Sequence, residues 1–255
     1  MNAVSTLPVC VRLSLWVTAA WAGHLDLDEA VRHAMPDVDD VRGDLARLGL
    51  WQDLGERVLG CALPRPGDLT GMPRGAPDFT GAAADAGECV FVPAMGGALV
   101  PTIDTYGPDG DVGTQITWDA YDCEPTPVHQ LESLQERQIE RDLAELVRDA
   151  TSAFETLDVQ PWAGSTARAH VDSRVRDSEW GLPPGLPGQA HRILVLAGSI
   201  GAAVDVALED SPAIGRHDTG TRHALLLRLQ AGADQALAQA TTSCALNLGG
   251  LRPAR

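Results

Sequence analysis

The stretch Leu99–Tyr121, LVPTIDTYGPDGDVGTQITWDAY, decides the fold class of this chain. It holds two strand candidates, Leu99–Tyr106 and Val112–Tyr121, and the tetrapeptide GPDG between them is a turn signal. Side chains alternate between the two faces of a strand, so Ile116 and Trp118 are expected on one face and Asp119 on the other. The pattern predicts an antiparallel pair of strands with one covered face.

A third strand candidate, Glu88–Val92, lies upstream, before the turn signal Gly96–Gly97. Pro101 cannot donate a hydrogen bond to a neighbouring strand, so its strand is expected at an edge or with a bulge. Together the three candidates predict a three-stranded antiparallel meander.

Helical patterns flank this meander. Residues 11–60 read as helices, and one stretch within them has apolar residues spaced by three and four, namely Val38, Val41, Leu45 and Leu48. Residues 64–87 read as a long Pro- and Gly-rich loop, and loops of that length inside a domain are often functional.

Downstream, Thr126 and Pro127 are expected to open the strongest helix, with the Thr as its cap. Further helices are predicted over about 165–179, 190–209 and 221–246. The predicted fold class is α+β, mainly helical, with a small three-stranded antiparallel sheet (meander) in the middle of the chain. The parts expected within one compact domain are an N-terminal helical part (1–63), the loop plus sheet (64–125) and a C-terminal helical bundle (126–255).

The acidic balance of the chain limits its partners. The 255 residues carry a formal net charge of −16, and all 19 basic residues are Arg. Nucleic acids and anionic membrane surfaces attract positively charged proteins, so neither is expected as a partner. The five cysteines form no C-x-x-C pair, which indicates a reducing compartment. The apolar run Leu13–Ala22 imitates an export signal but fits an amphipathic helix of the mature protein, so a cytoplasmic location is predicted.

The negative charge is concentrated in one window. No Lys or Arg occurs between Arg74 and Arg137, and this window holds eleven acidic residues: Asp78, Asp85, Glu88, Asp104, Asp109, Asp111, Asp119, Asp122, Glu124, Glu132 and Glu136. The window coincides with the predicted sheet. A surface of this kind favours a basic partner.

Two groups of residues are candidates for a site. Carboxylates at the edge of the sheet, followed by a His at the start of a helix, could hold a divalent cation, and the candidate ligands are Asp104, Asp119, Asp122 and His129. A basic cluster in the turn expected before the last helix could bind an anion or a small ligand, through Arg216, His217, Arg222 and His223. No motif for a nucleotide or a prosthetic group is present, so no cofactor is predicted apart from this divalent metal.

One segment carries a family resemblance. Its pattern consists of Pro66-Gly67-Asp68, Gly71, Gly75, Phe79, Ala83-Ala84 and Ala86-Gly87-Glu88. It resembles uncharacterised proteins of high-GC actinobacteria. The resemblance implies a cytoplasmic bacterial protein and no particular activity, because none is known for that group.

Two hypotheses for the function follow. The first is a non-enzymatic interaction or structural protein, whose acidic sheet and 64–87 loop meet a basic protein partner or a second copy of the chain. The alternative is a protein that binds a divalent metal or a small ligand, and that could be a hydrolase, through the acidic sheet. Whether the chain is an enzyme stays open at this point.

Overall fold

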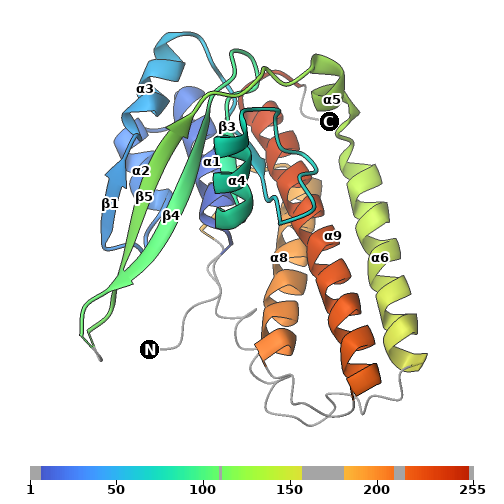
Figure 1. The fold of residues 1–255 in the computed structure, drawn as a ribbon. Helices are drawn as coiled ribbons and strands as arrows, with labels where there is room; N and C mark the ends of the chain where they lie inside the picture. The colour runs from blue at the N-terminus through green and yellow to red at the C-terminus, as the bar shows by residue number, and fades with distance from the viewer. Residues whose placement is uncertain (1–6, 109–110, 157–180, 210–215, 253–255) are drawn as a thin grey trace.

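The computed structural model describes residues 7–108, 111–156, 181–209 and 216–252. Within these ranges the fold is α+β, with eight helices and a five-stranded mixed sheet (Figure 1). The elements follow the chain in this order: α1 (Val9–Trp21), α2 (Leu27–Ala34), β1 (Asp40–Gly43), α3 (Ala46–Asp53), β2 (Gly60–Ala62), α4 (Pro77–Ala86), β3 (Cys89–Phe91), β4 (Ala98–Tyr106), β5 (Gly113–Tyr121), α5 (Val128–Ser133), α6 (Glu136–Thr156), α8 (Gly188–Glu209) and α9 (Arg216–Leu248).

The sheet corrects the predicted fold class. Its strand order is β1-β5-β4-β3-β2, with β1 parallel to β5 and the other pairs antiparallel. The prediction of a three-stranded antiparallel meander was therefore wrong. The three strand candidates correspond to β3, β4 and β5, whereas β1 and β2 come from residues that were predicted to be helical.

Strand β1 is held against β5 by the two Asp residues that flank it. The Asp39 N–H donates to the Thr114 carbonyl, and its carboxylate accepts the Thr114 N–H. Asp44 bonds in the same way to the Trp118 carbonyl and the Ala120 N–H. The regular apolar spacing in this stretch suggested one helix, but these bonds to a strand some 75 residues downstream give the backbone another partner.

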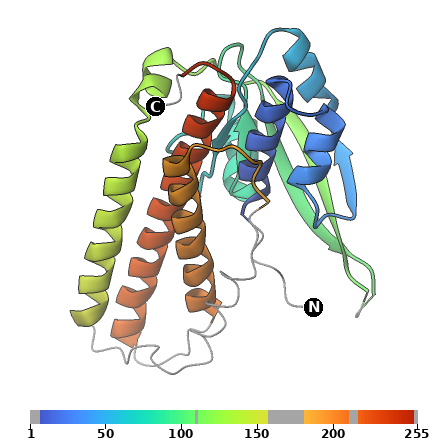
Figure 2. The same cartoon turned by 180° about the vertical axis from the view of Figure 1, so that it is seen from behind.

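Helix α1 lies between the sheet and the long helices α6, α8 and α9 (Figure 2). The main hydrophobic core surrounds it and joins residues of all three predicted parts, among them Leu13, Trp118 and Leu194. A smaller core lies on the opposite face of the sheet, where Phe79 and Ala83 of α4 cover Val100. The part boundaries at 63/64 and 125/126 stay predictions.

The long helices also differ in detail from expectation. The helix predicted after Thr126 is split into α5 and α6, and Pro127, rather than Thr126, occupies the N-cap of α5. The 64–87 loop contains α4. The helix predicted over 165–179 lies outside the described residues.

At the far edge of the sheet, the Thr242 hydroxyl of α9 accepts a hydrogen bond from the Cys61 N–H and donates one to the Cys61 carbonyl, and so satisfies the outer edge of β2.

Substitution of Gly43 tests the parallel pair. Gly43 has φ +93°, and a Cβ there would lie 2.1 Å from the Trp118 carbonyl oxygen, so Gly43→Ala must push β1 away from β5. Gly55 has a similar φ of +98° and open space around it, so Gly55→Ala is the matched control for backbone strain alone.

We expect the control to lose about 1 kcal/mol of unfolding free energy and Gly43→Ala about 1–3 kcal/mol more. Urea denaturation of both variants measures the difference. Equal losses in the two variants would contradict the close packing of β1 on β5.

Candidate interaction surface

Strand β4 of the β4–β5 hairpin is covered at one end only. In β4, the residues Ala98–Pro101 are buried, whereas all five residues of Thr102–Tyr106 are exposed. Helix α4 covers the buried end on one face, and Figure 1 shows the other end extending beyond the helices. Strand β4 therefore presents a solvent-facing half to a partner, whereas β5 beside it is partly buried.

Carboxylates gather where β5 ends beside α4. Asp119, Asp122 and Glu124 are exposed along the end of β5, and the exposed Asp78 lies in the first turn of α4. Partial burial, followed by the negative charges of Asp119 and Asp78, raises the pKa of the Tyr121 hydroxyl. Both carboxylates therefore lie close enough to Tyr121 to act on it, and Glu124 lines a hollow next to Arg74.

A shallow open groove adjoins these acids. Its walls are the Gly67–Gly75 segment and α4, its cavity volume is about 600 Å³, and its lining is mostly apolar. Leu69, with 42% of its surface exposed, lies on its rim. A neighbouring hollow of about 460 Å³ shares Leu69 and reaches Glu124. We call the groove, together with Asp78, Asp119, Asp122 and Glu124, the acidic surface.

The predicted metal ligands lie at separate positions. The register places Asp104 opposite Gln115 and Asp119 opposite Val100, so the two Asp residues are four positions apart along the hairpin, or ~13 Å at about 3.3 Å per residue. Asp122 follows β5 and His129 lies in α5, and all four side chains are exposed. Among the described residues, no group of three or more His, Cys, Asp or Glu side chains could hold a metal ion. The metal site stays a prediction.

The predicted anion cluster lies inside a helix. Arg216, His217, Arg222 and His223 belong to the first two turns of α9, so the expectation of a turn at this point was wrong. The Arg222 guanidinium donates to the Ala207 carbonyl of α8 at 3.4 Å, and His223 is exposed. The surroundings of Arg216 and His217 fall outside the described side chains, so anion binding also stays a prediction.

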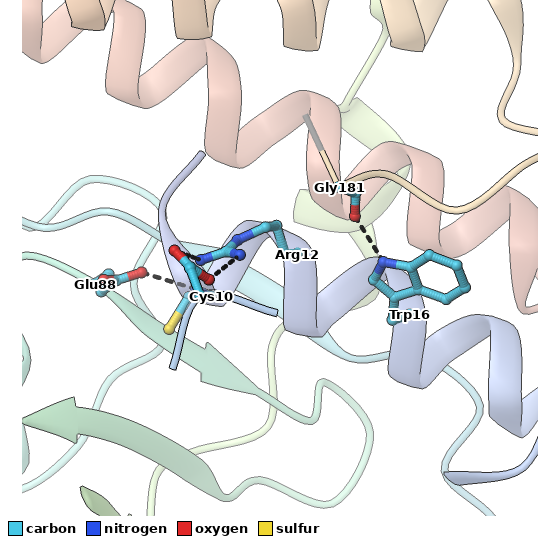
Figure 3. Close-up of polar contacts among 6 residues, drawn as sticks. Cys10, Arg12, Trp16, Glu88 and Gly181 are labelled. Carbon is cyan, nitrogen blue, oxygen red and sulfur yellow. Dashed lines mark hydrogen bonds and ion pairs between the residues drawn. The ribbon is translucent and has the colours of Figure 1, made fainter. Parts of the chain in front are cut away.

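A buried carboxylate escaped the sequence analysis. Glu88, 8% exposed, precedes β3, and its Oε2 accepts the backbone N–H of Cys10 at 2.8 Å, in the first turn of α1 (Figure 3). Burial raises the pKa of Glu88, although the Cys10 hydrogen bonds and the Arg12 charge act to lower it. An acid at the head of the apolar run Cys89–Val92 was the signal for such a group.

The surroundings of Glu88 favour a structural role. The carboxylate satisfies a donor at the positive end of a helix, which stabilises α1 in place. Burial raises the pKa of the nearby thiols of Cys10, Cys61 and Cys89, so they stay protonated and are poor nucleophiles and metal ligands. Two residues after Cys10 in α1, Arg12, 3% exposed, bonds to Asp37 at 2.7 Å.

One helix within the described ranges is long and apolar enough to cross a membrane. It is α8, in which 39% of the stretch Gly188–Leu208 is buried. Core helices of soluble proteins have the same length and composition, and α8 packs against α9 and α6.

Replacing Glu88 by Gln tests its raised pKa. A carboxyl group whose pKa is raised on folding stabilises the fold when protonated, and that contribution disappears as the pH rises from its ordinary value of 4.5 through the folded pKa. Gln retains an acceptor oxygen and does not titrate. We therefore expect the unaltered chain to lose stability relative to Glu88→Gln as the pH rises.

Chemical denaturation of both chains between about pH 5 and 8 measures this difference, and the other titrating groups cancel between them. If the unaltered chain instead gained stability relative to the variant at higher pH, the hydrogen bonds and Arg12 would outweigh burial.

Comparison with known families gives two matches in succession along the chain. Residues 10–132 match the N-terminal domain of the Rv1486c-like protein, and residues 137–251 match its C-terminal domain. No curated protein and no solved structure matched in the other two comparisons. The expectation of an uncharacterised family is confirmed, whereas the actinobacterial origin stays a prediction. Because the two matched ranges together span nearly the whole sequence, the chain belongs to the Rv1486c-like family.

Proposed function

We propose that this protein is a non-enzymatic interaction protein whose acidic surface binds a basic protein partner. The observation that carries the proposal is the combination of an open, mostly apolar groove with four exposed carboxylates, which come from a stretch of sequence, residues 75–136, without Lys or Arg. The exposed Arg74 lines the neighbouring hollow beside Glu124. Apolar contact area supplies affinity, and complementary charge supplies orientation and a fast encounter.

The chemistry of the described residues supports binding better than catalysis. The acids of the surface are exposed, and exposed carboxylates close to one another repel unless a counter-charge approaches. A partner rich in Arg or Lys relieves that repulsion on binding. The buried acid Glu88 and the neighbouring thiols instead support the packing of α1.

We also propose a cytoplasmic location. The five cysteines are free, and four of them are buried as neutral thiols in the hydrophobic cores. Such thiols suit a reducing compartment. The packing of α8 in the helical layer agrees with a core helix.

Neutralising the acidic surface tests the proposal. The variant Asp119→Asn/Asp122→Asn/Glu124→Gln removes three charges from it. The matched control Glu145→Gln/Asp149→Asn/Glu155→Gln removes three exposed charges from α6, and both variants have the same net charge. An oligo-arginine peptide serves as the probe, with oligo-glutamate as its negative control.

We expect the first variant to bind the probe about tenfold more weakly at low salt, because each exposed ion pair contributes a few tenths of a kcal/mol or more. The control should change binding little, and added salt should weaken binding to the unaltered chain. Fluorescence anisotropy measures each dissociation constant. Equal weakening in both variants would mean that only the overall charge matters, and would contradict the proposal.

A further inference from the structure

The outer half of β4 has an unpaired edge. On one side β4 pairs with β5 along its whole length, but on the other side β3 pairs only with Ala98 and Leu99. Just upstream of β3, Gly87 adopts a left-handed conformation with φ +75° and ends α4, so the chain leaves the line of the sheet there. Among the described residues, no strand continues that line beside Pro101–Tyr106.

The hydrogen bonds of β5 show which backbone groups face this edge. Thr114, Trp118 and Ala120 direct their backbone groups toward Asp39 and Asp44, on the β1 side. In an antiparallel pair, two residues directly opposite each other either exchange backbone hydrogen bonds or both direct their backbone N–H and C=O groups away from each other. The β4 partners of these residues therefore direct their backbone groups away from β5.

The register makes Pro101, Ile103 and Thr105 the edge-facing residues of the outer half. Pro101 is buried and has no N–H, so the available groups are the N–H and the carbonyl of Ile103 and of Thr105. The side chain of Ile103 is also open, with 51% of its surface exposed. This is a short strand edge with both backbone and apolar contacts to offer.

We infer that this edge accepts an extended segment of the basic partner as an added β-strand. The inference rests on the proposed function and names how the partner is held. Main-chain hydrogen bonds to Ile103 and Thr105 supply affinity, and the alternating side chains of β4 supply specificity. In the partner's segment, the residue that lies beside Ile103 on one face of the sheet is apolar. The residue that lies beside Asp104 on the other face is Arg or Lys.

Charge selects this occupant over a second copy of the chain. Pairing β4 with its own copy would bring together two chains of net charge −16 along their acidic windows. A basic segment instead brings opposite charge to Asp104, in a window that has no Lys or Arg of its own.

A peptide in which Arg and Val alternate is the probe, tested on the full chain. Hydrogen exchange should show that it protects the amides of Ile103 and Thr105. Ile103→Pro removes one edge donor without touching a bond to β5, as Pro101 already does two positions earlier. It should weaken binding about tenfold, whereas Ile103→Val, which keeps the donor, should not. The same peptide N-methylated on its Val residues should bind much more weakly.

The contrary outcomes are distinguishable. If the peptide binds but Ile103→Pro and N-methylation have no effect, strand addition is overturned and charge-driven binding to the acidic surface survives. If neither this peptide nor oligo-arginine binds, both proposals are overturned. If Ile103 and Thr105 become protected at high protein concentration without peptide, the edge pairs with a second copy and the inference is wrong.

Discussion

The architecture depends on burying helix α1 while giving the polar side chains in its middle partners outside the helix. Eleven of its thirteen residues are buried, on either side of Trp16, so few of its groups can reach water. Polar side chains in the middle of the helix find partners outside it: the Ser14 hydroxyl donates to the Leu59 carbonyl at 2.6 Å, and the Trp16 indole donates to the Gly181 carbonyl at 2.6 Å. At its end, the buried indole N–H of Trp21 has no hydrogen-bond partner among the described residues. Buried polar groups without partners cost several kcal/mol, so these contacts fix α1 relative to the elements around it.

The position of α1 between the sheet and the long helices explains why one part of the sheet is open. Helices α1 and α4 cover opposite faces at the Leu99 end of the β4–β5 hairpin, where the two cores meet the sheet. Neither helix reaches the far end, where Thr102 and Asp104 are exposed. A rigid, well-packed scaffold thus supports an acidic hairpin and a groove, which is the usual arrangement for a binding surface.

Local patterns in the sequence predicted the local parts of this fold. The strands β4 and β5 were expected within a residue or two of their ends, because alternation and a turn signal are properties of neighbouring residues. Strand β1 was missed because its partner lies far along the chain, and the spacing of Val38 and Val41 fits a helix equally well. Strand β2 has three residues, Gly60–Ala62, too few to show any period.

The candidate site could be predicted only in part, because some of its features are local in the sequence and others depend on the tertiary structure. Acidic residues are visible in a sequence, so the charge of the surface could be anticipated. The four-position offset between Asp104 and Asp119 depends on the register of the hairpin, and the groove depends on how α4 folds back beside Leu69. The partnership of Glu88 with Cys10, 78 residues apart, likewise requires the tertiary structure.

Site-directed photocrosslinking tests the central claim, that a basic protein partner binds at the acidic surface and along the open half of β4. A crosslinking residue would replace Thr102, exposed on the open half of β4, and in a second chain Ala144, exposed on α6. Each chain would be irradiated in an extract of the cells that produce it, and the crosslinked segment would be sequenced. The account predicts crosslinks from position 102 to an Arg- or Lys-rich segment, lost at high salt, and few from position 144. Crosslinks concentrated at position 144, or a neutral or acidic segment at position 102, would contradict it.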